Sequence, residues 1–182
     1  GQGVETIGSY PVAVSTEITS YADLWDTSLQ SSIGITSNFR VMNGMALKIA
    51  GESYNTEDIA TIEQAGEKLL ELAPNIRLIK DDNLQVDLLS GEVSAAVMYT
   101  SKVTQACMQN PGLQAVHPSS GIGFGIMAPF IPPIAHHTVA ASAFIDYILH
   151  PEVSKQCFAH IGSSCTNQAD DDLHEEEHNP FL

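Results

Sequence analysis

The most informative part of this chain is a run of apolar helical patterns interrupted by one proline, Phe144-Ile-Asp-Tyr-Ile-Leu-His-Pro-Glu-Val-Ser-Lys-Gln-Cys-Phe-Ala-His-Ile-Gly162. Proline cannot continue a helix, since it lacks the backbone N–H and its ring restricts the preceding residue. The stretch therefore predicts two helices that meet at His150-Pro151, the first of them covering 138–149. Ile161-Gly-Ser-Ser-Cys-Thr-Asn167 continues the same pattern.

The composition is that of an acidic globular protein. The 182 residues include 7 Lys and Arg against 22 Asp and Glu, a formal net charge of −15, and 43% are hydrophobic. This balance argues against nucleic acid as a partner, because neutralising phosphates needs clustered Lys and Arg. No apolar run reaches the roughly 18 residues that a membrane-spanning helix needs. The sequence begins Gly-Gln-Gly-Val-Glu without a signal peptide, so any export signal has been removed or lies outside it.

Strand and helix patterns alternate along most of the chain. Segments rich in β-branched residues predict strands at 4–14, 33–36, 76–79, 93–99 and 113–116. Helical spacing of apolar residues and helix-capping side chains predict helices that start at Ser20 and Asn55 and others over 38–50, 83–90 and 101–109. Strands that alternate with helices predict an α/β fold with a largely parallel sheet flanked by helices. The run at 93–99 is apolar throughout, which is typical of a strand buried on both faces.

Four motifs resemble those of extracellular solute-binding proteins of the spermidine/putrescine class. The closing stretch is similar to the family's "FIDYLLxPEV…IGYxxPN", and 20–26 resembles "SWADLWxP". Ser90-Gly-Glu-Val93 leads to Tyr99 as "xGEVxxxxxW" leads to tryptophan, and 118–132 is similar to "PKEGxxxxxDxxAIP". The motifs occur in the family's order over roughly 4–168.

The resemblance implies a periplasmic-binding-protein-like lobe and a division of the chain. Members of the family hold a small solute between two lobes and deliver it to ABC permease subunits outside the cytoplasmic membrane. Residues 4–124 would form the second lobe, 125–167 a strand–helix segment that packs on the first lobe, and 168–182 an acidic tail. The chain would lack the first lobe itself. The helix at 138–149 would then expose apolar side chains unless the missing lobe or another chain covered 125–165.

The resemblance also places a ligand site, but with altered chemistry. Polyamine binding needs carboxylates for the ammonium groups and aromatic faces for the methylene chain. Asn38 and Val41 stand where the family has acidic ligands, Tyr99 matches a tryptophan, and Gly125 and Met127 match a Trp-x-Asp pair. Every carboxylate expected from this lobe is therefore absent. Two hypotheses remain: another solute, neutral or anionic, bound through Thr36, Ser37, Asn38, Tyr99 and Thr100, or a structural subunit without a ligand.

No other pattern indicates catalysis, a cofactor or a metal. Cys107, Cys157 and Cys165 lack C-x-x-C spacing, although the last two could form a disulfide. His174 and His178 lie four residues apart among acidic neighbours, a pattern more typical of a solvated tail than of a metal site. We therefore expect a binding protein rather than an enzyme.

Overall fold

The structure is a computed structural model that describes residues 2–11, 13–126 and 128–161. Its strands are β1 (Gln2–Ser9), β2 (Ile33–Ile35), β3 (Ile76–Ile79), β4 (Ala95–Tyr99), β5 (Gln114–Val116) and β6 (Phe124–Ile126). Its α-helices are α1 (Phe39–Ile49), α2 (Ile59–Leu72), α3 (Leu84–Ser90), α4 (Thr100–Gln109), α5 (Thr138–Ile148) and α6 (Pro151–Ile161). Short 3-10 turns cover Tyr21–Trp25, Thr27–Leu29 and Ala73–Asn75.

The strands form one mixed sheet in the order β3-β2-β4-β1-β5, with β6 also paired to β1. β2 runs parallel to both β3 and β4, whereas β1 runs antiparallel to β4, β5 and β6. All the strands except β1 consequently point the same way. The predicted largely parallel sheet is confirmed, with β1 as the reversed strand between β4 and β5.

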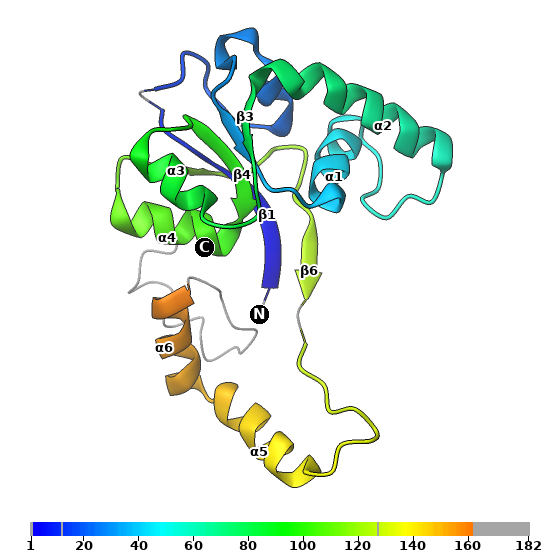
Figure 1. The fold of residues 1–182 in the computed structure, drawn as a ribbon, viewed down its shortest axis with the longest axis vertical. Helices are drawn as coiled ribbons and strands as arrows, with labels where there is room; N and C mark the ends of the chain where they lie inside the picture. The colour runs from blue at the N-terminus through cyan, green and yellow to red at the C-terminus, as the bar shows by residue number, and fades with distance from the viewer. Residues whose placement is uncertain (1, 12, 127, 162–182) are drawn as a thin grey trace.

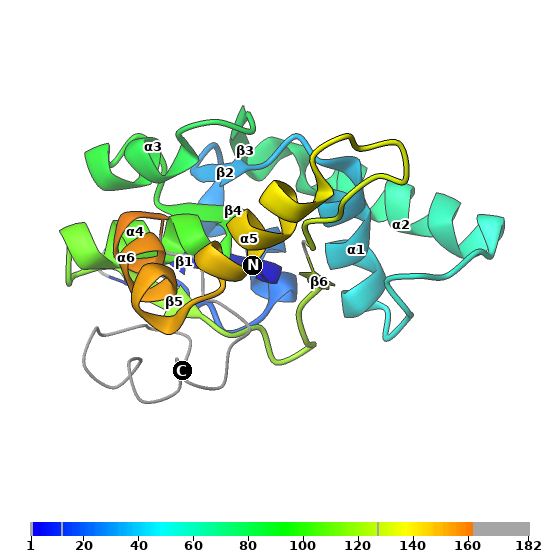
Figure 2. The same cartoon turned by 90° about the horizontal axis from the view of Figure 1, so that it is seen from below.

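Helices cover both faces of the sheet, and β4 contributes to both cores. α1 and α2 lie on one side, and α3 and α4 lie on the other (Figure 1 and Figure 2). Ala95 and Val97 belong to the core under α1 and α2, while Ala96 and Met98 belong to the core under α3 and α4. The alternation follows from the period of two along a strand. It confirms the expectation that this strand is buried on both faces.

Helix boundaries follow the capping residues that the sequence shows. The Asn38 side chain accepts a hydrogen bond from the Arg40 N–H at 3.0 Å and caps α1. Asp58 caps α2 through the Thr61 N–H at 3.1 Å. Gly91 ends α3 with φ of 77°, a left-handed conformation that glycine adopts without a Cβ clash. The capping side chains satisfy N–H groups that a helix start leaves without partners.

Residues beyond β6 leave the body of the fold as an extension. The chain runs from β6 to α5 and α6 away from the sheet, and α6 returns beside α4 (Figure 1). The Gln105 side chain donates to the His160 carbonyl at 3.4 Å, which links α4 to α6. α5 ends at Ile148 and α6 starts at Pro151, as the His150-Pro151 pair predicts.

The outward face of α5 is apolar and exposed. Val139 is 83% exposed, Phe144 62% and Tyr147 63%, and no residue of α5 is buried. The expected exposed face is thus present. Within the described ranges no helix is long and apolar enough to cross a membrane.

Several predictions fall outside the described residues. They concern Met127, Cys165, the motif end at 162–167, the acidic tail at 168–182, and the His174/His178 pair.

Candidate functional site

The carboxyl ends of the parallel strands meet at one edge of the sheet. Beyond β2, the Thr36 N–H donates to the Val97 carbonyl at 3.1 Å, and beyond β3, the Lys80 N–H donates to the Ile35 carbonyl at 3.1 Å. In open α/β sheets ligands bind outside this edge. The segment 36–38, the end of β4 at Tyr99 and the turn at Asp81 are therefore brought together although they lie far apart in sequence.

Asn38 and Tyr99 form a direct pair at this edge. The Asn38 amide nitrogen lies 3.2 Å from the Tyr99 hydroxyl, while the amide oxygen caps α1. Tyr99 is 37% exposed, so part of its ring remains accessible. Thr100 follows directly as the first residue of α4. The pair offers a hydrogen-bonding amide and an aromatic face.

The Asp81 carboxylate binds the segment that precedes α1. It accepts hydrogen bonds from the Thr36 hydroxyl at 2.9 Å, the Ser37 N–H at 3.0 Å and the Ser37 hydroxyl. Hydrogen bonds from the hydroxyls of Ser37 and Thr36 hold the pKa of Asp81 below its ordinary range. The Ser37 N–H is consequently engaged by a carboxylate of the chain itself. Sequence patterns could not predict Asp81 as the partner of Ser37, because the two residues lie 44 positions apart.

Val41 lies in the core rather than at the strand edge. It is 1% exposed and packs with Met45, one helical turn further along α1. Residues four apart share a helix face, so the apolar pair already indicated a core position. Thr36 is also buried, at 3% exposure, and contributes its hydroxyl to Asp81.

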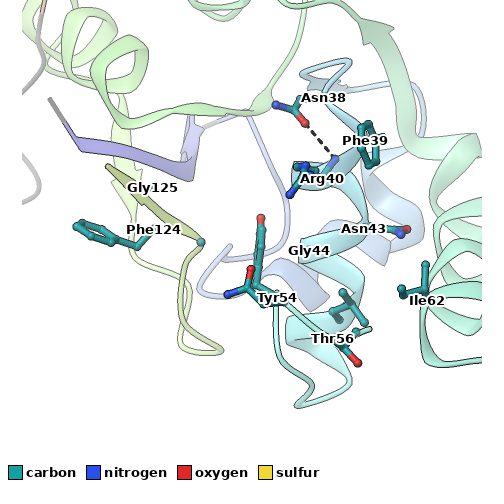
Figure 3. Close-up of a pocket in the computed structure, with 13 residues that line it drawn as sticks. Asn38, Phe39, Arg40, Asn43, Gly44, Tyr54, Thr56, Ile62, Phe124 and Gly125 are labelled. Carbon is teal, nitrogen blue, oxygen red and sulfur yellow. Dashed lines mark hydrogen bonds between the residues drawn. The ribbon is translucent and has the colours of Figure 1, made fainter. Parts of the chain in front are cut away.

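A cleft of about 450 Å³ lies beside α1 and reaches Asn38 (Figure 3). Of the expected site residues, Asn38 and Gly125 line it, whereas Thr36, Ser37, Val41, Tyr99 and Thr100 do not. Sequence reasoning missed the other lining residues, which come from α1, the loop before α2, α2 itself and the segment around β6: Phe39, Arg40, Asn43, Gly44, Leu47, Tyr54, Asn55, Thr56, Ile62, Gly123 and Phe124. The helical spacing of Arg40, Asn43 and Leu47, opposite the Val41 face, was the signal that could have indicated some of them.

The Tyr54 ring forms one wall of the cleft and is held between two glycines. A Cβ placed on Gly44 would lie 1.9 Å from the ring, and one on Gly123 would lie 2.6 Å from it. The Tyr54 hydroxyl lies 3.4 Å from the Val41 carbonyl, so the ring joins the loop before α2 to the first turns of α1. The Phe124 ring, by contrast, points away from α1 (Figure 3).

The described residues offer no site for a metal. No group of three or more His, Cys, Asp or Glu side chains in them is arranged to hold an ion. Cys107 is half-buried, and its burial raises the pKa of the thiol. A buried thiol of raised pKa is a poor nucleophile.

A family model of bacterial extracellular solute-binding proteins matches residues 14–182. The chain belongs to this family. It is 32% identical over 168 residues to the spermidine/putrescine-binding periplasmic protein of Salmonella typhimurium, covering 92% of this chain and 48% of that protein. The chain thus spans about half the length of the curated relatives that it matches.

Solved structures of the same kind share the fold. The spermidine/putrescine ABC transporter substrate-binding protein of Streptococcus pneumoniae superposes with a TM-score of 0.79 at 25% identity, over 97% of this chain and 55% of that one. An ABC transporter protein from Clostridium perfringens gives a TM-score of 0.71 at 27% identity, over 92% of this chain and 54% of that one. The expected family and α/β solute-binding-protein fold are confirmed. The family is a transport family rather than an enzyme class, and its members are extracellular or periplasmic.

Proposed function

We propose that the chain is the solute-binding component, or one lobe of it, of an ABC importer that works outside the cytoplasmic membrane. The observation that carries this proposal is the position of the exposed Asn38–Tyr99 pair beyond the carboxyl ends of the parallel strands. Ligands of open α/β sheets bind at that edge. The proposed role is non-catalytic, and its partners are a small polar solute and the ABC permease subunits.

We infer further that the solute is not a polyamine. The two positions of α1 and its cap that are acidic in the resembling family hold Asn38 and the buried Val41, and Gly125 provides no side chain. A desolvated ammonium group without a counter-charge costs several kcal/mol. Asp81, a carboxylate at this edge, already accepts three hydrogen bonds from Thr36 and Ser37.

The proposed domain division gives the exposed extension a role. Residues 4–124 would act as the second lobe, and 125–167 would cross to a first lobe or to another chain that covers the apolar face of α5. A structural subunit without a ligand is the second candidate. Its supporting observation is the exposed apolar face of Val139, Phe144 and Tyr147, which a permanent partner chain would cover as well as a first lobe would.

Native mass spectrometry of the protein isolated from its source tests the two candidates. Solute capture predicts a small-molecule adduct on the protein, and the mass of the adduct narrows the class of solute. A protein that is free of adduct and bound stoichiometrically to other polypeptides would instead support the structural subunit and overturn the transport proposal.

The inference about polyamines has its own test. Isothermal titration of the unmodified protein with putrescine should show weak or no binding, and Asn38→Asp combined with Met127→Asp should strengthen it because the two changes add counter-charges. Sub-micromolar affinity of the unmodified protein for spermidine would show that these positions do not decide specificity.

A further inference from the structure

Among the residues that the structure describes, the cleft beside α1 is lined by one positively charged residue and by no acidic residue, although the chain as a whole is acidic. Arg40 is the only formally charged residue among the described residues that line it, in a protein whose net charge is −15. Glu57 and Asp58 follow Thr56 along the chain, but neither lines the cleft, and the Asp58 carboxylate is taken by the start of α2. The cleft therefore carries a positive charge in an acidic molecule.

The Arg40 guanidinium has no carboxylate partner where the structure describes side chains. The ion pairs found there join Lys68 to Glu71, Arg77 to Glu92 and Lys80 to Asp87. The contact found for Arg40 is instead with the ring of Phe39, whose centroid lies 5.8 Å from the guanidinium carbon. A guanidinium that rests on an aromatic ring keeps its N–H donors available for another group.

The rest of the lining suits a small polar solute. Asn43, Asn55 and Thr56 supply neutral donors and acceptors, and Leu47 and Ile62 supply apolar surface. The volume of about 450 Å³ is in the usual range for ligand sites, which are largely apolar with a few placed polar groups. The Tyr54 ring, held between Gly44 and Gly123, fixes one wall.

We propose that this cleft binds the anionic group of a small solute, a carboxylate or a group of similar charge, with the Arg40 guanidinium as its counter-ion. This assignment rests on the proposed function and adds to it the charge class of the solute. Arginine pairs with a carboxylate through two parallel hydrogen bonds, which are stronger than bonds between neutral groups. A cationic group in the same place would meet Arg40 without any carboxylate of the lining to offset it.

Two probes of equal length and opposite charge test the assignment. Succinate and putrescine each have a four-carbon chain, the first with two carboxylates and the second with two ammonium groups. Titration of the ¹⁵N-labelled 182-residue chain at millimolar concentrations should shift the amide signals of Arg40, Asn43 and Asn55 with succinate. Putrescine should leave those signals in place.

Substitutions of Arg40 and Lys48, two cationic residues of α1, distinguish a specific role of Arg40 from an effect of net charge. Arg40→Gln should weaken succinate binding about tenfold or more, the loss expected for a hydrogen bond to a charged group. Arg40→Lys should retain part of the affinity. Lys48→Gln changes the net charge equally on α1 but lies outside the lining, so it should leave succinate binding within about twofold.

Three results would overturn the assignment. They are an absence of shifts with succinate, equal losses in the Arg40→Gln and Lys48→Gln variants, and shifts of the cleft signals with putrescine in place of succinate. Each leaves the proposed function standing if the isolated protein carries a small-molecule adduct. A protein without any adduct, bound to other chains, would instead remove the transport role on which the assignment rests.

Discussion

At the scale of single residues, Asn38 and Asp81 organise the edge where the strands end. Asn38 uses its amide oxygen to cap α1 and its amide nitrogen to reach Tyr99. Asp81 lies just after β3 and accepts hydrogen bonds from Thr36 and Ser37, which lie between β2 and α1. It therefore links the ends of these two strands. The side chain of Asn38 is therefore oriented from both sides, by its own helix and by β4.

The cap predicts different outcomes for two substitutions of Asn38. Asn38→Ala removes the acceptor for the Arg40 N–H and should lower the free energy of unfolding by about 1 kcal/mol. Asn38→Asp keeps an acceptor at the cap and should leave that free energy within about 0.5 kcal/mol. Urea denaturation of the three proteins measures both effects, and equal losses in the two variants would contradict the capping role.

The hydrogen bonds of Asp81 predict a pH dependence with a definite sign. Because its native pKa lies below its value in the unfolded chain, Asp81 adds stability above the unfolded value of about 3.9. That contribution is lost as the pH falls through the lowered native pKa. Asp81→Asn should therefore reduce stability at pH 7 and differ less from the parent protein at pH 3 and below. Denaturant unfolding at both pH values measures the difference, and a deficit that grows in acid would contradict it.

At the scale of elements, two glycines in neighbouring helices occupy opposite environments. Gly44 of α1 faces the Tyr54 ring, and an added Cβ would lie 1.9 Å from it. Gly66 of α2 has nothing within 4 Å of an added Cβ. The same substitution thus tests whether the contact between α1 and the loop before α2 supports the fold.

The two helices should respond to alanine in opposite directions. Gly66→Ala should raise the free energy of unfolding by about 0.5–1 kcal/mol, because alanine has the higher helix propensity. Gly44→Ala should lower it by about 1–3 kcal/mol, because the displaced Tyr54 ring outweighs that gain. Thermal and urea unfolding of both variants provide the measurement. A stabilised Gly44→Ala protein would show that Tyr54 can move aside at little cost.

At the scale of the whole molecule, the extension carries an apolar face that the body does not cover. Ile134 is 85% exposed, and Val139 and Phe144 continue this surface along α5. The body, by contrast, closes its two cores on either side of the sheet. The extension is the part of the described chain that most needs another surface to bury its apolar side chains.

Removing apolar groups from this face should change association and leave folding intact. Val139→Ser with Phe144→Ser should keep the free energy of unfolding within about 1 kcal/mol, since both side chains are exposed. The double variant should also reduce self-association of the chain at high concentration. Light scattering coupled to size-exclusion chromatography measures this, with Leu70→Ser as the control at an exposed apolar site of α2. Equal self-association of the parent protein, the control and the double variant would contradict association through the apolar face of α5.

The family, the order of the main elements and several helix boundaries could be predicted from the sequence. These depend on local patterns: the apolar run at β4, the cap at Asn38, Gly91, and the His150-Pro151 break. The helix expected from Asn55 instead begins at Ile59, after the Asp58 cap. The candidate site could be predicted only in part, since Asn38 and Gly125 line the cleft and Val41 is in the core.

The packing of the sheet and helices determines which distant side chains meet. It brought Asp81 onto Ser37 across 44 residues, placed the Tyr54 ring between Gly44 and Gly123, and left Arg40 open to the cleft. Local spacing fixes the face on which a side chain lies, but the packing of the sheet and helices chooses its partner. The charge available to a solute depends on those partners, and it could not be read from the chain alone.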